Sequence, residues 1–329
     1  MPATPAAPLL EVAHLTAGFG ANGRFVAAVR DVGFSVGPGE TLGLVGESGS
    51  GKSVTALSIV RLLQPPGRIT GGSVIFRGTD LLGLSEAEMQ KVRGAGIGFI
   101  FQEPMSALNP VFTVGDQIAE ALVIHERLTW REARARAVDL LQAVRIADPA
   151  RRARDYPHQL SGGMRQRVMI AVALACRPPL VIADEPTTAL DVTIQAEVLE
   201  LLRELRARHQ LSLLLITHDL GVIAEMADTV AVMYAGAIVE HAPVRDIFHT
   251  PAHPYTRALL ASMPGAAGGE RLRAIDGAVP SPGDLPPGCA FEPRCVDRLE
   301  ICGREAPDTR RAGEQHSACC HLFPRGPEA

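Results

Sequence analysis

Residues 43–53 have the sequence Gly-Leu-Val-Gly-Glu-Ser-Gly-Ser-Gly-Lys-Ser, and residues 46–53 fit the pattern G-x-x-x-x-G-K-[ST] of a phosphate-binding loop. Three glycines allow the backbone to curl so that successive N–H groups point into one concave surface. The helix that follows adds its positive N-terminal end. The pattern predicts that phosphate groups are bound by Gly46, Glu47, Ser48, Gly49, Ser50, Gly51, Lys52, Ser53 and Val54.

Lys52 and Ser53 have the most specific expected roles in this phosphate loop. Lys52 is expected to reach the β- and γ-phosphates of a nucleotide, and the Ser53 hydroxyl is expected to hold Mg²⁺. The chain contains only two lysines, Lys52 and Lys91, so a chance match to a pattern that requires lysine is rare. The alternative is a glycine-rich turn that binds no ligand.

The overall composition narrows the class of protein. A chain of 329 residues is long enough for two domains, and its net charge of −4 gives no electrostatic reason to expect nucleic acid as a partner. The longest apolar runs, 168–176 and 211–216, are far below the roughly 20 residues that cross a bilayer. Residues 1–10 lack the basic start of a signal peptide. We therefore expect a cytosolic protein, or one docked on a membrane from its cytosolic side.

The order of the expected elements indicates an α/β fold. Strands are predicted at 11–17 and 25–36, before the phosphate loop, and a helical segment at 113–154. Within that segment Thr129 and Glu132 have the spacing of a capping box. From residue 180 the chain returns to strands that alternate with helices, which is typical of a parallel-rich sheet. These later strands are expected at 180–183, 211–217 and 229–234.

Two carboxylates end the apolar run Leu-Val-Ile-Ala-Asp-Glu at residues 180–185. A strand that ends beside a phosphate loop is where an aspartate orders Mg²⁺, so this role is assigned to Asp184. Glu185 follows directly and is expected to act as the general base toward the water that attacks the γ-phosphate. By itself, an apolar strand that ends in Asp-Glu is a weak signal.

Residues 160–166, Leu-Ser-Gly-Gly-Met-Arg-Gln, add a second anion-binding surface. With this stretch the chain resembles the ABC transporter ATPases, whose signature is LSGGQ, although Met164 stands where that signature has Gln. The resemblance covers about residues 8–250 and includes three more motifs. These are Gln102 as the Q-loop, Ala189-Leu190-Asp191 as the D-loop, and His218 as the switch histidine.

The resemblance implies both a fold and a mechanism. The fold is an α/β, RecA-like P-loop NTPase core at residues 8–250, with an antiparallel β edge and a helical subdomain at about 105–175. Two such domains pair head to tail, so that ATP lies between the phosphate loop of one and Ser161, Gly162, Gly163 and Asp191 of the other. Gln102 contacts the metal, and His218 contacts the γ-phosphate. An aromatic ring stacks on adenine, and Phe19 is the first choice for it, with Phe25 as the second.

Two further stretches resemble the ATPases of oligopeptide, dipeptide and nickel importers. They are residues 101–110 and residues 253–260 with the cysteine-rich end, and we call residues 251–329 the C-terminal extension. This resemblance implies peptide import at the cytoplasmic face of the cell membrane. The expected partners are two permease subunits, a second and related ATPase, and indirectly a substrate-binding protein. A nickel or metal-chelate importer stays open as an alternative, and an exporter is less favoured. The family's DNA-repair and translation ATPases are not favoured, because residues 8–250 carry neither a long coiled coil nor a second ATPase unit.

Four cysteines of the extension, Cys289, Cys295, Cys302 and Cys320, form the last expected site. Such a loop-rich segment needs a cross-link, and a reducing compartment disfavours disulfides. Zinc would normally use paired C-x-x-C knuckles, which this segment lacks. An iron–sulfur cluster of the [4Fe–4S] type is therefore the first expectation, and zinc and unligated thiols stay open. Cys319 is the alternative to Cys320, and Cys176 is expected to be a core residue.

Overall fold

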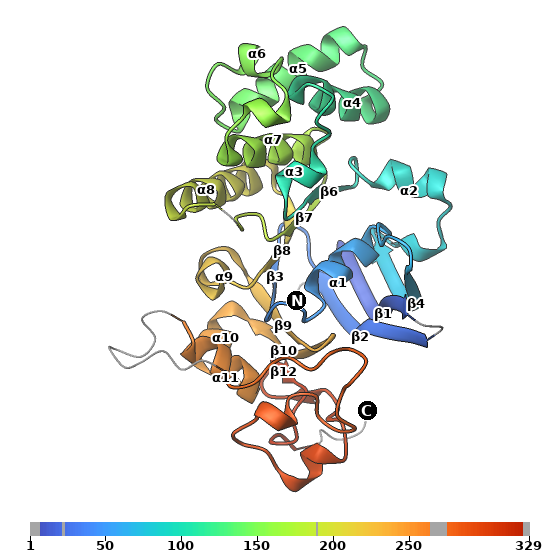
Figure 1. Cartoon of the computed structure of the whole chain (residues 1–329), viewed down its shortest axis with the longest axis vertical. Helices are drawn as coiled ribbons and strands as arrows, with labels where there is room; N and C mark the ends of the chain where they lie inside the picture. Colours follow the sequence, from blue (N-terminus) through green and yellow to red (C-terminus); the bar gives the residue numbers. More distant parts are fainter. Residues whose placement is uncertain (1–6, 22–23, 189, 264–274, 325–329) are drawn as a thin grey trace, which may run out of the picture. The chain divides into compact units, whose positions relative to one another are not determined.

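The structure is a computed structural model that describes residues 7–21, 24–188, 190–263 and 275–324 (Figure 1). The chain divides into two compact units. One contains residues 37–39 and 83–215, and we call it the helical unit. The other contains residues 8–36, 40–82 and 216–329, and we call it the phosphate-loop unit.

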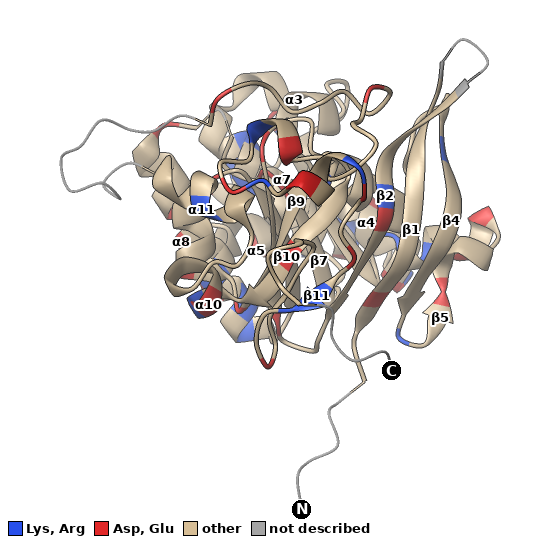
Figure 2. Ribbon diagram, turned by 90° about the horizontal axis from the view of Figure 1, so that it is seen from below, with Lys and Arg blue, Asp and Glu red and all other residues tan. Residues whose placement is uncertain are grey.

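The phosphate-loop unit contains an antiparallel sheet of strands in the order β2-β1-β4-β5. The long strands β1 (Leu10–Ala21), β2 (Arg24–Val36) and β4 (Gly67–Phe76) lie side by side in Figure 2. The short strand β5 (Thr79–Asp80) and a 3₁₀ turn, η1 (Leu81–Gly83), follow β4. The antiparallel β edge implied by the resemblance is therefore confirmed. Strand β1 continues past Ala17 because Gly18 pairs with both Ala27 and Arg68, where a side chain would collide with the Val26 carbonyl.

A second set of strands supports the phosphate loop. Strand β3 (Thr41–Val45) is buried along its whole length and runs parallel to β9 (Thr229–Tyr234). Burial on both faces explains why β3 has no polar alternation. Strand β10 (Ala237–Pro243) pairs antiparallel with β9, and the extension adds β12 (Ser317–Ala318) and β11 (Arg310–Arg311) beyond it.

Two helices of this unit, α9 and α11, begin after residues whose side chains cap the first turn. Helix α9 (Leu220–Met226) is capped by Asp219, which accepts hydrogen bonds from the N–H groups of Gly221 and Val222. His253 caps α11 (Pro254–Ala261) by accepting from the Tyr255 N–H at 3.0 Å. The remaining helices and 3₁₀ turns are α1 (Lys52–Ile59), α10 (Val244–His249), η3 (Glu292–Arg294) and η4 (Glu300–Gly303).

The helical unit carries the parallel strands β6 (Ile97–Ile100) and β7 (Leu180–Asp184), and β8 (Ser212–Thr217) lies next to β7. The predicted capping box of Thr129 and Glu132 is confirmed at the start of α5 (Trp130–Ala143). The helical segment predicted at 113–154 corresponds to α4 (Val114–Glu126), α5 and α6 (Pro149–Arg152). The unit also contains α2 (Glu86–Val92), α3 (Pro104–Ala107), η2 (Pro157–Gln159), α7 (Gly162–Leu174) and α8 (Val192–His209).

Within the described residues, the structure contains no helix that combines the length and the apolar character needed to cross a membrane.

Candidate functional site

The phosphate loop joins β3 to α1, and its glycines are where the backbone requires them. Gly51 has a φ of 104°, and a Cβ there would lie 2.6 Å from the Ala28 carbonyl oxygen. A Cβ on Gly46 would lie 2.2 Å from the Met233 carbonyl oxygen. The loop therefore passes too close to neighbouring backbone for any side chain at these two positions. Of the other predicted residues, Ser50 is buried, Ser53 and Val54 are half-buried in the first turn of α1, and Ser48 and Gly49 are exposed.

Lys52 is held over the loop by the loop's own carbonyl groups. Its ammonium donates to Gly46 O at 2.7 Å and to Glu47 O at 3.0 Å, with Ser50 Oγ at 3.4 Å. Its side chain is buried, with 5% of the residue exposed. A buried cation inside a loop of backbone N–H groups is an arrangement suited to a polyphosphate.

Glu47 has two partners that the sequence did not indicate. Arg294 forms a bidentate ion pair with its carboxylate, at 2.8 and 3.0 Å, and Tyr255 Oη accepts from its N–H at 2.9 Å. Both partners belong to the C-terminal extension, more than 200 positions away in the sequence. No local pattern predicts such contacts.

His218 and the two phenylalanines also lie in the phosphate-loop unit. His218 is exposed at the residue after β8, directly before the capping residue of α9. Phe19 is 37% exposed and lies in β1, where its ring packs close to Gly67. The Phe25 ring is half-buried, with the Arg68 guanidinium 5.2 Å from its centroid. Phe19 is therefore the more accessible of the two rings.

The helical unit brings three of the predicted polar groups together. Asp184 is buried at the end of β7, and Glu185 follows with a φ of 48°, which is unusual for a residue other than glycine. The Glu185 Oε2 atom accepts from Gln102 Nε2 at 2.9 Å and from Thr188 Oγ1 at 2.7 Å. Sequence analysis predicted Glu185 and Gln102, whereas Thr188 was not singled out. Two donors thus fix the direction of the carboxylate expected to activate water.

The signature stretch lies at the start of α7. Ser161 caps this helix by accepting from the Met164 N–H at 3.3 Å, and Ser161 and Gly162 are exposed. A Cβ on Gly163 would lie 2.7 Å from the Ile194 side chain, so glycine allows α7 and α8 to pack closely. Asp191 caps α8 by accepting from the Ile194 N–H at 3.0 Å. Ala189, in the predicted D-loop, lies outside the described residues.

The four cysteines Cys289, Cys295, Cys302 and Cys320, which we call the cysteine group, lie close to one another. Burial raises the pKa of Cys289 to about 11, and the charges of the other three cysteines, which must lie nearby, act in the same direction. Backbone N–H groups donate to all four sulfur atoms, from Phe291, Asp297, Leu299 and Leu322. Cys319 is apart from this group, with its sulfur 3.2 Å from Thr309 Oγ1 and 3.3 Å from the Ile238 carbonyl oxygen.

The arrangement of the cysteine group gives no support to the expected iron–sulfur centre. Among the described residues, no set of three or more His, Cys, Asp or Glu side chains is arranged to hold a metal ion.

Cys176 follows α7 and is half-buried. Its thiol donates to the Ala121 carbonyl oxygen, and burial raises its pKa to about 11.

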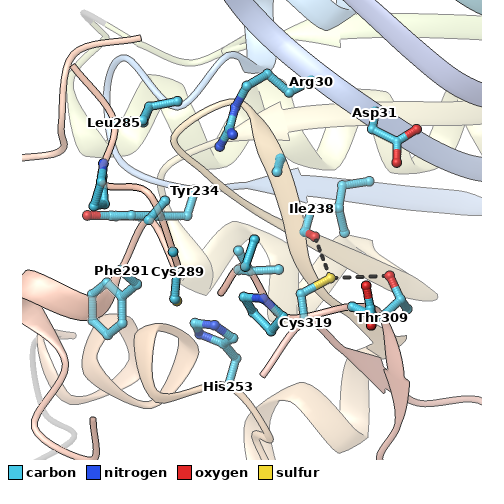
Figure 3. A pocket seen from close by; sticks show the side chains of 18 residues that line it. Arg30, Asp31, Tyr234, Ile238, His253, Leu285, Cys289, Phe291, Thr309 and Cys319 are labelled. Carbon is cyan, nitrogen blue, oxygen red and sulfur yellow. Dashed lines mark hydrogen bonds between the residues drawn. The ribbon is translucent and has the colours of Figure 1, made fainter. Parts of the chain in front are cut away.

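A cavity of about 300 Å³ opens beside the cysteine group. Figure 3 shows Cys289, Cys319 and His253 around it, with Arg30 on the opposite side. His253 is buried, and this burial lowers its pKa to about 4, with the charge of Arg257 acting in the same direction. No phosphate-loop residue lines this cavity, so it is separate from the predicted nucleotide-binding residues.

Comparison with known proteins agrees with this set of features. Residues 29–188 match the family model described as ABC transporter, and residues 239–302 match the one described as the oligopeptide/dipeptide transporter, C-terminal region. A putative peptide import ATP-binding protein of Brucella ovis is 51% identical over 95% of this chain and 96% of its own. One from Brucella melitensis is 51% identical over 97% of this chain and 96% of its own.

Solved structures of similar proteins are also ATP-binding cassettes. A dimeric post-hydrolysis structure of the cassette MJ0796, bound to ADP and Pi, has a TM-score of 0.65 and 29% identity and covers 72% of this chain and 99% of its own. The cbiO1 structure from Clostridium perfringens, part of an ABC transporter complex, has a TM-score of 0.62 and 25% identity and covers 74% and 91%. The chain therefore belongs to the ATP-binding subunits of ABC transporters, which are ATPases, and carries the C-terminal region of their oligopeptide/dipeptide branch.

Proposed function

We propose that this chain is the ATP-hydrolysing subunit of an ABC importer for peptides. The observation that carries the proposal is the oligopeptide/dipeptide C-terminal region, at residues 239–302, joined to an ATP-binding cassette. The names of its Brucella relatives support it. A nickel or metal-chelate importer is the alternative, and an exporter is less favoured. The proposed division is a catalytic domain at 8–250, whose helical subdomain spans about 105–175, and an extension at 251–329.

The phosphate loop is proposed to bind the triphosphate of ATP through its N–H groups and Lys52. The burial of the Lys52 ammonium and the glycine-dependent path of the loop backbone support this role. Mg²⁺, when bound, would offset phosphate charge, and the oxygen atoms of Ser53, Asp184 and Gln102 are suited to hold it. His218, exposed after β8, would donate a hydrogen bond to the γ-phosphate. Phe19 is proposed to stack on adenine, with Phe25 as the alternative.

Glu185 is proposed to act as the general base. A water oxygen attacks the γ-phosphorus, the bond to the ADP oxygen breaks, and the Glu185 carboxylate receives the proton of the water. The hydrogen bonds from Gln102 and Thr188 orient that carboxylate before the reaction. A pre-oriented base lowers the cost of reaching the transition state.

The signature residues are proposed to complete the ATP site of a partner subunit. Ser161, Gly162, Gly163 and Asp191 would face ATP bound by the phosphate loop of a second, related ATPase in a head-to-tail heterodimer. The exposure of Ser161 and Gly162 at the N-terminus of α7 supports this role. The dimeric form of a related cassette also supports it.

Two permease subunits are the proposed membrane partners, and a substrate-binding protein would act through them. The segment after Gln102 exposes three apolar side chains, Met105, Val111 and Phe112, which would pack against a permease. The chain would thus be a peripheral protein at the cytoplasmic face of the cell membrane.

The cysteine group is proposed to bind an iron–sulfur cluster of structural function. The proposal rests on the four cysteines of a loop-rich segment and on the backbone N–H groups that donate to their sulfur atoms, although the described side chains are not arranged around a metal ion. A cluster, when bound, would cross-link the loops of the extension. Anaerobic purification followed by iron, sulfide and zinc analysis tests this proposal. Iron and sulfide in equal amounts support it, whereas stoichiometric zinc or no metal would reject it.

Replacement of Glu185 by Gln tests the enzymatic part of the proposal. In the assembled complex, this variant should bind ATP with the wild-type affinity and lose at least about 100-fold in turnover, because only the base is removed. Glu200→Gln, on the exposed face of α8, is the matched control and should keep full turnover. Wild-type turnover by the Glu185 variant would reject the assigned role.

Uptake of a labelled dipeptide or of nickel by cells that express the complete complex distinguishes the two substrates.

A further inference from the structure

The C-terminal extension holds one residue of the phosphate loop from two sides. Arg294, in η3, forms two hydrogen bonds to the Glu47 carboxylate, Nη1 to Oε2 at 2.8 Å and Nη2 to Oε1 at 3.0 Å. Tyr255, in α11, accepts a hydrogen bond from the Glu47 backbone N–H at 2.9 Å. Glu47 is the second residue of the loop, between Gly46 and the glycines that precede Lys52. The backbone and the side chain of one loop residue are therefore both fixed by the extension.

The Arg294 guanidinium is itself held rigidly. Its Nε atom donates to Asp276 O at 2.9 Å, Nη2 also donates to Ile275 O at 3.3 Å, and Nη1 also donates to Tyr234 Oη at 3.3 Å. With the two bonds to Glu47, each of its three nitrogens is occupied. The Arg294 side chain is 5% exposed, compared with 29% for its partner carboxylate. A buried and fully bonded guanidinium has little freedom, so it fixes the position of what it binds.

Glu47 connects two cations, Lys52 and Arg294. The Glu47 carbonyl accepts from the Lys52 ammonium at 3.0 Å, while the Glu47 carboxylate pairs with Arg294. A carboxylate without this partner would place a negative charge in a loop that binds a negatively charged triphosphate. The ion pair removes that repulsion and directs the carboxylate toward the extension.

We propose that Arg294 is a positioning residue of the ATP site, which neutralises Glu47 and fixes the phosphate loop in the conformation that binds ATP. The extension would then help to determine ATP affinity although it contains none of the nucleotide-binding motifs. The proposal rests on ATP binding by this chain. Because Arg294 acts before the reaction begins, its loss changes the affinity for ATP and leaves the chemical step intact.

Titration of the full chain with a fluorescent ATP analogue and Mg²⁺ tests the proposal. Arg294→Ala should raise the Kd at least about 10-fold, because the loop then carries an unpaired carboxylate. Arg294→Lys keeps the charge but not the fork, and it should have an intermediate Kd. The double variant Glu47→Gln/Arg294→Ala should recover most of the lost affinity, because the unpaired charge is gone. Arg304→Ala, an exposed arginine of the same extension, is the matched control and should bind as the wild type does.

The outcomes separate this inference from the function it rests on. If the wild-type chain does not bind the analogue, ATP binding itself is refuted. If the wild type binds and Arg294→Ala binds equally well, only the role of Arg294 is refuted. A double variant that binds no better than Arg294→Ala would also overturn the proposal, because general unfolding of the extension would not be relieved by removing a charge. Should Arg294→Ala fail to fold, the Arg294→Lys titration decides, and wild-type affinity there would reject the proposal.

Discussion

Acidification should loosen the extension through one buried histidine. Burial is the main cause that lowers the pKa of His253 from its ordinary value of 6.5 to about 4, and the charge of Arg257 lowers it further. A hydrogen bond to the Cys319 backbone has the opposite effect. Between these two pH values the unfolded chain binds a proton at His253 that the folded chain does not. The contribution of His253 to the free energy of unfolding is therefore fully present above about pH 6.5 and is lost as the pH falls toward 4.

The size of the effect follows from the two pKa values. Between pH 7 and pH 5 the free energy of unfolding should fall by about 2 kcal/mol, which is about 20-fold in the opening equilibrium. His253 caps α11 through its Nδ1 atom, so the amides of this helix should report the change. Hydrogen exchange measured by mass spectrometry, corrected for the intrinsic rates, should show about 20-fold lower protection in α11 at pH 5. Helix α7, in the helical unit, is the internal reference.

A variant without the titrating group provides the control. His253→Asn keeps a side-chain oxygen that can cap α11 but does not titrate in this range. Its stability can be lower at every pH, but its protection in α11 should change much less between pH 7 and pH 5 than that of the wild type. An equal pH dependence in both proteins, or none in the wild type, would refute this account of His253.

Two further predictions concern the phosphate loop and an isolated thiol. Gly51→Ala should abolish binding of a fluorescent ATP analogue. Residue 51 has a φ of 104°, and the added Cβ would lie 2.6 Å from the Ala28 carbonyl oxygen. Retained binding by the folded variant would contradict this prediction. Cys176, whose pKa burial raises to about 11, should react with iodoacetamide at pH 8 at least about 100-fold more slowly than a free cysteine, as measured by peptide mapping, and rapid labelling of the folded chain would contradict its burial.

The features that could be predicted from the sequence are those that depend on neighbouring residues. The positions of the loop glycines follow from the local path of the backbone, and the capping box of Thr129 and Glu132 follows from the geometry of one helical turn. The hydrogen bond between Gln102 and Glu185 crosses 83 positions. Each of these two residues was nevertheless marked by its own motif, so both belonged to the predicted set.

The contacts made by the extension had no comparable signal. Arg294 and Glu47 are 247 positions apart, and neither stands in a pattern that indicates the other.

The end of β1 was missed for a related reason. Gly18 weakens a strand when it is read from the sequence alone, but here it allows close pairing with two neighbouring strands. The resemblance favoured Cys320 over Cys319 as the fourth thiol, but the contacts of Cys319 with Thr309 and Ile238 could not be predicted from the sequence.

The short strand β12 has a consequence for how the chain is synthesised. It pairs with Glu240 and His241 of β10, and the nearby His316 contacts the Glu240 carboxylate at 2.7 Å from 76 positions further along the sequence. During translation, β10 therefore emerges from the ribosome long before its partner, and its outer edge stays unpaired for that interval. An open strand edge can associate with other chains. Nascent or truncated chains that stop before residue 316 should therefore depend on chaperones and tend to aggregate, even though residues 46–53 and 180–185 are complete.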